Sequence, residues 1–342
     1  MRAGLENWLV GHWYSSHQPP WYLRLREPVY RAAYQRDQKS KKDSSAVYQP
    51  GLPLVVVGNL TAGGSGKTPL IIRLCQIALD MNLKPGIAST GYGRKSSDTL
   101  LVQADSDTRT CGDEPVMLAQ RTGVPVVVAA NRPDAVKKLN DMDLDLVFSD
   151  DGLQQADLAR DIEFCVVDGE RGLGNGHLIP AGPLREPAER LRQVDFVVSN
   201  GEWADKPKDL DVNVMRLDAS VVRSLDDEME CPVDEFRQKH AGNPLIAFAA
   251  IGNPQRFFKM LESMGIRVEA HGFPDHHTFT RNDFASLTAG CAIIMTEKDA
   301  VKCRGLGLQN AWYVPVETRL TDEFERIIKD LLAKLMKDSE ER

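Results

Sequence analysis

The sequence lacks any run of apolar residues long enough to cross a bilayer, since polar residues interrupt every stretch before 18 residues. It does not open with a basic stub, an apolar segment and a small-residue cleavage site, so we expect a protein that is not exported. Its six cysteines include no C-x-x-C pair, which argues against a zinc ribbon or a disulfide framework and favours a reducing, cytoplasmic compartment. Internal repeats and low-complexity tracts are also lacking. What remains is a polar chain of 342 residues, enough for two α/β domains.

The start of the chain carries a net positive charge, whereas the rest of the chain is net negative. Residues 1–42 hold eight basic and three acidic side chains, a net of +5 that leaves −12 for the rest. This head also carries three of the five tryptophans and four of the seven tyrosines. Aromatic and basic side chains together are typical of a membrane-associating segment, where each Lys or Arg near an anionic surface contributes about 1 kcal/mol. Amphipathic helices docked on the main domain are the alternative, and the acidic body argues against nucleic acid.

Short apolar runs alternate with helical patterns along most of the chain. The runs are continuous rather than alternating, which is typical of parallel strands buried on both faces. Helical patterns follow at 67–81, at 133–140 and near the end of the chain. The predicted strands are LVVVGN (54–59), PGIAS (85–89), PVVVAA (125–130), LDLVFSD (144–150), IEFCVV (162–167), DFVVSN (195–200), NPLIAFAAIG (243–252), CAIIMT (291–296) and AWYVPV (311–316).

This alternation predicts a doubly wound, mostly parallel α/β sheet, with a second, smaller α/β domain. A boundary is expected in the polar stretch from about 201 to 242, which has little sustained apolar pattern. We therefore predict a head at 1–42, a nucleotide-binding domain at 43–220 and a second domain at 221–342 that closes the active-site cleft.

The segment TAGGSGKTP (61–69) lies between an apolar run and an apolar helical pattern. In a P-loop, G-x-x-x-x-G-K-[ST], backbone N–H groups surround phosphate oxygens, the lysine reaches the β- and γ-phosphates and the hydroxyl residue holds Mg²⁺. Lys67 and Thr68 fit these places, although Thr61 stands where the first glycine is expected, and a chance glycine turn is the alternative. The residues predicted to bind the nucleotide here are Thr61, Ala62, Gly63, Gly64, Ser65, Gly66, Lys67 and Thr68.

LDLVFSDDG places Asp150 and Asp151 directly after an apolar run, as in a Walker B element. Two such carboxylates could instead cap a helix or face solvent. Combined with the glycine-rich segment, they predict an Mg²⁺–nucleotide site with a P-loop NTPase-like fold and with Thr68, Asp150 and Asp151 on the metal. ATP is favoured over GTP, because neither NRPD (131–134) nor TEKD (296–299) has the lysine of N-K-x-D.

Two further polar clusters allow both a structural and a functional interpretation. CGDEPVMLA (111–119) puts Asp113 and Glu114 at the start of a predicted helix, where they could serve only as caps. NGHLIPAGPLREP (175–187) ends with Arg185 and Glu186, which suit a phosphate or metal clamp but also a rigid connector held by an ion pair.

A third cluster, GFPDHHTFT (272–280), contains Asp275, His276 and His277. Histidines next to an aspartate indicate either a metal site or an Asp–His catalytic pair. The sequence favours the Asp–His pair, because no further His or Cys cluster lies nearby.

The chain resembles the tetraacyldisaccharide 4′-kinase family in strings that occur in this order: VVVGNLTAGGSGKTP, TGYGRK, GDEP, DDGLQ, GNGHLIPAGPLRE, AAIGNPQRFF, DHH and MTEKDAVKC. They extend from about residue 54 to residue 303, which is most of the chain. That family likewise lacks the first P-loop glycine. The resemblance implies a lipid A pathway enzyme that transfers the γ-phosphate of ATP to the 4′-hydroxyl of a tetraacylated glucosamine disaccharide 1-phosphate.

The resemblance also implies roles for individual residues. Asp113 would be the general base toward the sugar hydroxyl, and His276 the partner that orients it and tunes its pKa. A base is needed because a sugar hydroxyl is a poor nucleophile near neutral pH. Arg185 and Glu186 occupy positions of active-site contacts, which we assign to the nucleotide side. A histidine arriving from the second domain would couple catalysis to closure of the cleft.

Two departures from the family pattern affect these expectations. The family commonly reads S-R-G-Y-G where this chain has STGYG at 89–93, so an arginine contact is either lost or taken over by Arg94. The head is less apolar than the anchoring helix of many relatives and is interrupted by Pro19, Pro20 and Pro28. We therefore expect attachment to the cytoplasmic face of the bacterial inner membrane rather than a span.

The sequence thus predicts a peripheral, monomeric membrane kinase that uses ATP and Mg²⁺, acts on an acylated disaccharide and has no nucleic-acid partner. One alternative is a P-loop kinase with a soluble acceptor. Another is a nucleotide-driven switch or metallochaperone, in which Asp275, His276 and His277 bind a metal and hydrolysis only resets the shape.

Overall fold

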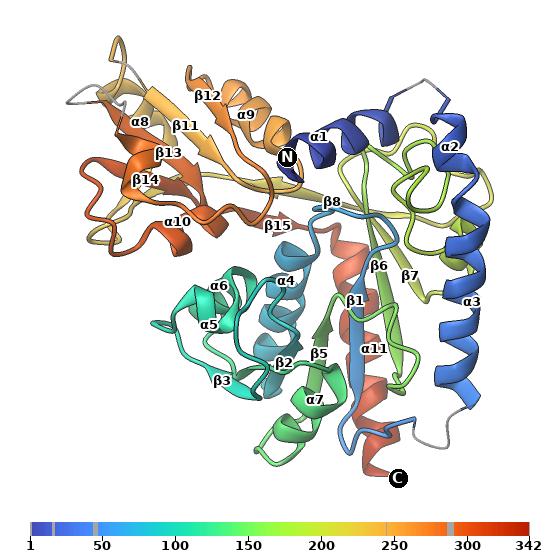
Figure 1. Ribbon diagram of the computed structural model, residues 1–342. Helices are drawn as coiled ribbons and strands as arrows, with labels where there is room; N and C mark the ends of the chain where they lie inside the picture. Colours follow the sequence, from blue (N-terminus) through green and yellow to red (C-terminus); the bar gives the residue numbers. More distant parts are fainter. Residues whose placement is uncertain (1, 16–17, 44–46, 244, 286–290, 342) are drawn as a thin grey trace.

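The computed structural model describes residues 2–15, 18–43, 47–243, 245–285 and 291–341. Two β-sheets dominate it, each sandwiched between helices or loops (Figure 1). The larger sheet lies toward the C-terminal helix α11 (Asp322–Glu340), and the smaller one lies at the upper left.

The larger sheet has nine strands among the described residues, in the order β15-β8-β7-β6-β1-β5-β2-β4-β3. Neighbours from β8 to β4 are parallel, while the edge strands β3 and β15 are antiparallel to theirs. The sheet is therefore mostly parallel, as the sequence predicts. Its strands are β1 (Leu54–Gly58), β2 (Pro85–Ser89), β3 (Leu100–Val102), β4 (Val126–Val128), β5 (Leu146–Asp150), β6 (Ile162–Asp168), β7 (Phe196–Asn200), β8 (Asn213–Asp218) and β15 (Glu317–Arg319).

Both faces of this sheet are covered, which explains the continuous apolar strands. Along β1, Val55 and Val57 point into one core, and Leu54 and Val56 point into the other. The first core is closed by α4 (Lys67–Asp80), α6 (Asp113–Thr122) and α11. The second is closed by α7 (Arg132–Asn140) and by the long segment that follows β6, which includes the 3₁₀ turn η1 (Ala188–Arg192). The short helix α5 (Thr108–Cys111) precedes α6.

The smaller sheet has six strands in the described part of the chain, in the order β10-β9-β14-β13-β11-β12. The four strands from β14 to β12 are parallel, and β9 and β10 are antiparallel. Helices α8 (Val233–Lys239) and α9 (Pro254–Ser263) bury Phe236 and Phe258 against one face, and α10 (Glu297–Cys303) and the turn η2 (Arg281–Phe284) cover the other. The strands are β9 (Val221–Ser224), β10 (Glu230–Pro232), β11 (Leu245–Ala249), β12 (Glu269–Gly272), β13 (Ala292–Thr296) and β14 (Ala311–Val314).

The chain crosses between the sheets twice, first between β8 and β9 and again between β14 and β15. The second crossing differs from the division expected from the sequence, which assigned everything from 221 to 342 to the second domain. Strand β15 pairs with β8, and α11 packs against α4, so residues 317–341 lie with the larger sheet. The apolar stripe of α11 is visible in the sequence, but a stripe does not specify which sheet it covers.

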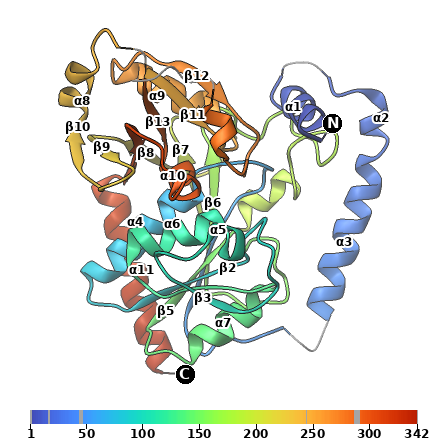
Figure 2. The ribbon, with the colours of Figure 1, turned by 60° about the vertical axis from the view of Figure 1, so that its left-hand side comes forward.

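The head forms α1 (Arg2–Trp13), α2 (Trp21–Arg24) and α3 (Glu27–Asp43), and α3 extends along one side of the larger sheet (Figures 1 and 2). It is docked through side-chain hydrogen bonds: Trp13 Nε1 donates to the Pro180 carbonyl at 3.0 Å, and the Tyr34 hydroxyl donates to Glu186 at 2.6 Å. Trp21, Leu25 and Val29 nevertheless remain 72%, 66% and 70% exposed. The described helices include none that combines the length and the apolar character needed to cross a bilayer.

Helix α11 offers a direct stability test of its assignment to the larger sheet. Ile328 is 1% exposed and Ile327 is 39% exposed. We expect Ile328→Ala to lower the free energy of unfolding by about 2–5 kcal/mol, because it leaves a cavity against α4, and Ile327→Ala by less than about 1 kcal/mol. Urea titration followed by circular dichroism measures both. Equal effects of the two substitutions would contradict this packing.

Candidate active site

The glycine-rich segment joins β1 to α4, the strand-to-helix setting that a P-loop requires. Gly66 caps α4 with φ of 99°, and a Cβ at this position would lie 2.3 Å from Asn200 Nδ2. Only glycine satisfies both conditions. Lys67 extends its ammonium to within 3.2 Å of Asn59 Oδ1 and 3.4 Å of Asp151 Oδ1. The lysine is thus held by polar groups at the place where phosphates are expected.

Asp150 and Asp151 stand at the carboxyl end of β5, next to this lysine. Asp150 Oδ2 accepts a hydrogen bond from Ser89 Oγ at 3.1 Å, whereas Oδ1 is buried with no hydrogen-bond partner among the described residues. Burial, with a contribution from the charge of Glu114, raises the pKa of Asp150 to about 7. Such a buried, unpaired carboxylate oxygen suits a hard cation such as Mg²⁺, whose charge would offset the desolvation.

Asp151 adopts a left-handed backbone conformation with φ of 52°, and its carboxylate is surrounded by cations. It accepts a hydrogen bond from Arg185 Nη1 at 2.9 Å. Burial would raise the pKa of Asp151, but Lys67, Arg185 and Arg132 outweigh it and keep this pKa well below the usual range. Adjacent carboxylates thus differ widely in proton affinity, a pattern common at functional sites.

A cavity of about 270 Å³ lies beside the P-loop and is closed by residues of the smaller sheet. Gly64 and Gly252 both line this cavity and pack against each other, because a Cβ on Gly252 would lie 2.1 Å from the Gly64 nitrogen. Asn200 links the two sides, because its Nδ2 donates to the Ser65 carbonyl at 3.2 Å and its Oδ1 accepts from Arg256 at 2.6 Å. The nucleotide cavity therefore needs both sheets in contact.

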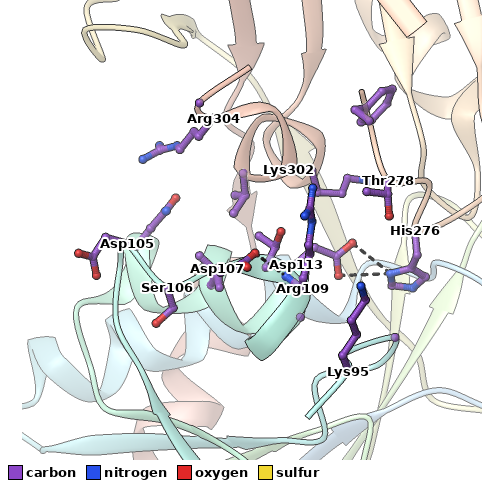
Figure 3. A pocket seen from close by; sticks show the side chains of 18 of the residues that line it. Lys95, Asp105, Ser106, Asp107, Arg109, Asp113, His276, Thr278, Lys302 and Arg304 are labelled. Atoms are coloured by element: carbon purple, nitrogen blue, oxygen red, sulfur yellow. Dashed lines mark hydrogen bonds and ion pairs between the residues drawn. The ribbon is translucent and has the colours of Figure 1, made fainter. Parts of the chain in front are cut away.

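Asp113 and His276 come together from the two sides of the cleft. Asp113 is the first residue of α6, and His276 follows β12 with a left-handed φ of 59°. His276 Nδ1 lies 3.0 Å from Asp113 Oδ2 and 3.2 Å from Oδ1 (Figure 3). The sequence-based pairing of these residues therefore agrees with their geometry, although 163 positions separate them.

The charges around this pair keep the carboxylate ionised. Burial alone would raise the pKa of Asp113, but the hydrogen bond from His276 and the charge of Lys298 hold it well below the usual range. Burial would lower the pKa of His276, but the hydrogen bond to Asp113 outweighs it and the pKa is raised. At neutral pH the carboxylate is thus available as a proton acceptor.

A second cavity, of about 860 Å³, opens on the other side of this pair (Figure 3). Asp113 and His276 lie on its wall, and Lys95, Arg109 and Arg304 are among the polar residues around it. Glu114, the neighbour of Asp113, lines the smaller cavity instead. The pair therefore stands between a space beside the P-loop and a larger polar space that can admit an acceptor.

Some residues expected at the nucleotide lie elsewhere. The cavity is lined by the loop from Gly64 onward. The Ala62 N–H instead donates to the Pro183 carbonyl at 2.8 Å, and Thr61 forms a bridge with Leu184. These contacts join both residues to the segment that carries Arg185, and neither residue lines the cavity.

Arg185 and Glu186 also lie outside the lining of the nucleotide cavity. Arg185 contacts Asp151, while the buried carboxylate of Glu186 binds the Tyr34 hydroxyl and the Gln154 amide. Glu186 therefore serves as a docking point for the head. Arg94 likewise hydrogen-bonds to the carbonyls of Thr90, at 3.0 Å, and Asp98 and lines neither cavity.

His277 does not join His276 in a common site. Its Nε2 lies 3.2 Å from Asp283, a residue of η2. No group of three or more His, Cys, Asp or Glu side chains within the described ranges is arranged to hold a metal ion.

The sequence analysis assigned no role to several residues that the fold brings into the site. Lys298 Nζ lies 2.9 Å from Glu114 and 3.2 Å from Asp275, and Asn200 and Arg256 join the P-loop to the smaller sheet. Lys298 belongs to the string MTEKDAVKC and Arg256 to AAIGNPQRFF, so these strings contained the signal. Their function depends on the arrangement of two sheets, which spacing along the chain does not reveal.

Comparison with known proteins gives consistent results. The model of the LpxK family, tetraacyldisaccharide-1-P 4′-kinase, matches residues 20–333. The chain is 40% identical over 338 residues to a tetraacyldisaccharide 4′-kinase of Azotobacter vinelandii, covering 98% of this chain and 99% of the relative. It is 42% identical over 304 residues to one from Vibrio parahaemolyticus, covering 88% and 87%. The crystal structure of LpxK from Aquifex aeolicus in complex with ATP covers 92% of this chain and 97% of that one, with 27% identity and a TM-score of 0.72.

The contact between Gly64 and Gly252 predicts a steric effect on nucleotide binding. Gly252→Ala places a methyl group against the P-loop backbone, so we expect the affinity for ATP to fall about tenfold or more, which is roughly 1.4 kcal/mol or above. Calorimetric titration with ATP measures this. Gly272→Ala is the control, since its Cβ would meet nothing closer than 3.5 Å. An unchanged affinity in Gly252→Ala would contradict the closed arrangement.

Proposed function

From the premise that the chain belongs to the tetraacyldisaccharide 4′-kinase family, we infer that it is an ATP-dependent phosphotransferase with an alcohol acceptor. It transfers the γ-phosphate of ATP to the 4′-hydroxyl of a tetraacylated glucosamine disaccharide 1-phosphate in lipid A biosynthesis. The observation that carries the catalytic assignment is the hydrogen-bonded Asp113–His276 pair between the P-loop cavity and the larger polar cavity.

We propose that Asp113 accepts the proton of the 4′-hydroxyl as that oxygen attacks the γ-phosphorus. The low pKa of Asp113 makes it a weak base, but it guarantees the ionised form, and in a loose phosphoryl-transfer transition state positioning contributes more than basicity. His276 orients the carboxylate through its Nδ1 and, when protonated, adds a positive charge beside the reacting centre.

On the nucleotide side, the loop from Gly64 to Thr68 and the ammonium of Lys67 would bind the phosphates. Mg²⁺ would be held by Thr68, Asp150 and Asp151, and when bound it neutralises charge on the β- and γ-phosphate oxygens. The unpaired Asp150 oxygen supports this assignment. Arg185, on Asp151, keeps that carboxylate oriented from the other side.

The head would attach the enzyme to the cytoplasmic face of the inner membrane, where its acylated substrate resides. Exposed Trp21, Leu25 and Val29 support this proposal, and Arg24 and Arg26 add basic groups in the same short segment. Tyr30 and Tyr34 join the head to Arg185 and Glu186, so a membrane-bound head would hold the catalytic body at a fixed distance from the bilayer. One chain supplies every residue of the proposed site, and we propose a monomer.

If Asp113 is the general base, its removal should impair phosphate transfer and leave ATP binding nearly unchanged. Asp113→Ala should lower transfer of labelled phosphate from ATP to an acylated disaccharide 1-phosphate by about 10²-fold or more, as expected for loss of a general base. Its affinity for ATP should stay within about threefold, since the P-loop is intact. Asp134→Ala, whose side chain lies in the first turn of α7 and is 45% exposed, is the control. Retained transfer in Asp113→Ala would remove this residue from the base role.

A variant whose head is made more polar, but keeps the contacts that dock it on the larger sheet, tests the proposed binding to the membrane. The triple variant Trp21→Ser, Leu25→Ser, Val29→Ser should shift the protein from vesicles of anionic phospholipid to solution in a flotation assay, because the apolar contact with the bilayer is lost. A matched triple variant at exposed apolar residues elsewhere, Leu101→Ser, Met229→Ser and Ile327→Ser, should float as the unmodified protein does. Equal flotation of both variants would refute the membrane role.

A further inference from the structure

Lys298 is a buried cation that meets carboxylates from both sides of the cleft. It is the second residue of α10, and its side chain is 12% exposed. Its ammonium lies 2.9 Å from Glu114 Oε1, 3.2 Å from Asp275 Oδ1 and 3.9 Å from Asp113 Oδ2. Glu114 and Asp113 belong to α6 beside the larger sheet, whereas Asp275 belongs to the loop after β12 of the smaller sheet.

Removing this cation would leave three carboxylates facing one another in a largely buried place. Buried ions of like charge repel each other strongly, and a lone buried carboxylate has lost its hydration. The positive charge of Lys298 offsets this repulsion. Burial would lower the pKa of Lys298, but the charges of Glu114 and Asp275 outweigh burial, and the pKa is raised. The ammonium group of Lys298 therefore adds to the direct hydrogen bond between Asp113 and His276 in holding α6 against the loop after β12.

The loop that Lys298 holds is the one that carries His276. Asp275 is the residue directly before it, and the backbone N–H of His276 donates to Asp275 Oδ1 at 3.0 Å. Lys298 thus contacts the same carboxylate oxygen that binds the backbone N–H of His276. The φ of His276 is 59°, which is unfavourable for a non-glycine residue, so the surrounding contacts have to stabilise this conformation.

We propose that Lys298 is a positioning residue for phosphate transfer: by binding Glu114 and Asp275 at once, it holds the loop after β12 against α6, so that His276 reaches Asp113. This rests on the role proposed above for Asp113. Lys298 acts on the acceptor side of the reaction through these carboxylates and makes no contact of its own with the sugar.

A direct contact with the terminal phosphate of ATP is the competing role, because Lys298 also lines the nucleotide cavity. An ammonium group has three N–H donors. Glu114 and Asp275 occupy two of them at hydrogen-bond distance, and Asp113 stands next to the third. Two of the three donors of Lys298 are thus bound by carboxylates, the third lies 3.9 Å from Asp113 Oδ2, and Lys67 already provides the cation of the P-loop.

The two roles differ in pH dependence. The charges that face Asp113 come from His276, Lys298 and, at longer range, Lys302, and those that face Lys298 come from Asp113, Glu114 and Asp275. Lys298 lowers the pKa of Asp113, so its removal raises that pKa. Activity that needs ionised Asp113 is present above this pKa and lost as the pH falls through it. We therefore expect the contribution of Asp113 to the acid limb of the kcat/KM profile to move to higher pH.

The experiment compares Lys298→Met, Lys298→Arg and Lys259→Met in the lipid transfer assay with ATP and acylated disaccharide 1-phosphate. We expect Lys298→Met to lower kcat about 10- to 100-fold, with KM for ATP within about threefold and the acid limb shifted upward. Lys298→Arg should restore part of kcat. Lys259 is the matched control, because its ion pair with Glu170 also crosses between the two sheets but is 62% and 50% exposed. Lys259→Met should behave as the unmodified enzyme.

Asp275→Asn is a second, nearly isosteric substitution. It removes the negative charge of Asp275 from the ion pair with Lys298 and keeps the lysine. It should lower kcat in the same direction as Lys298→Met, without an upward shift of the acid limb. Thermal unfolding of each variant establishes that it is folded at the assay temperature.

Two results would overturn the proposal. One is a KM for ATP raised more than about tenfold in Lys298→Met with kcat and the acid limb unchanged, which would make Lys298 a nucleotide ligand. The other is a Lys298→Met enzyme that equals Lys259→Met in every parameter. Failure of the underlying base assignment is recognised separately, because Asp113→Asn would then retain transfer whatever Lys298 does.

Discussion

The hydrogen bond between Asp113 and His276 is the interaction on which the rest of this active site depends, because it joins two separately built sheets at the reacting centre. Asp113 starts a helix of the larger sheet, and His276 lies in a strained turn of the smaller one. The surrounding contacts all act to bring these two elements together: Lys298 binds Glu114 and Asp275, Arg256 binds Asn200, and Gly252 packs against Gly64.

The fold explains why these groups meet at one place. Strands β1, β5 and β7 are parallel, so their carboxyl ends, which carry the P-loop, Asp150 and Asn200, lie at one edge of the larger sheet. In the smaller sheet the parallel strands β11 and β13 are likewise followed, within three residues of their carboxyl ends, by Gly252 and Lys298. Two such edges face each other, and backbone donors, cations and carboxylates therefore converge on the space between them. Burial raises the pKa of Asp150 to about 7, whereas the hydrogen bond from His276 and the charge of Lys298 lower the pKa of Asp113 in spite of its burial.

The sequence was sufficient for those parts of the structure that are local or strongly apolar. All nine predicted strands occur, because strands buried on both faces are continuous apolar runs. Short edge strands such as β3, β10 and β12 were missed, since their partly exposed residues carry no such pattern. The association of α11 with the larger sheet, the use of Glu186 as a docking point for Tyr34, and the bridge made by Lys298 all depend on contacts between segments that lie far apart in the chain. A sequence motif can identify residues such as Glu186 and Lys298, but it does not predict which residues they contact in the folded chain.

The central claim is that the acceptor hydroxyl is deprotonated by Asp113 while the two sheets are closed on the nucleotide. A crystal structure with a non-hydrolysable ATP analogue and an acylated disaccharide 1-phosphate tests it most directly. The predicted result is a 4′-oxygen within hydrogen-bond reach of the Asp113 carboxylate, at about 2.6–3.2 Å, and in line with the γ-phosphorus. A 4′-oxygen directed instead toward Arg185 and Asp151, with the Asp113–His276 pair intact but remote from it, would contradict the account.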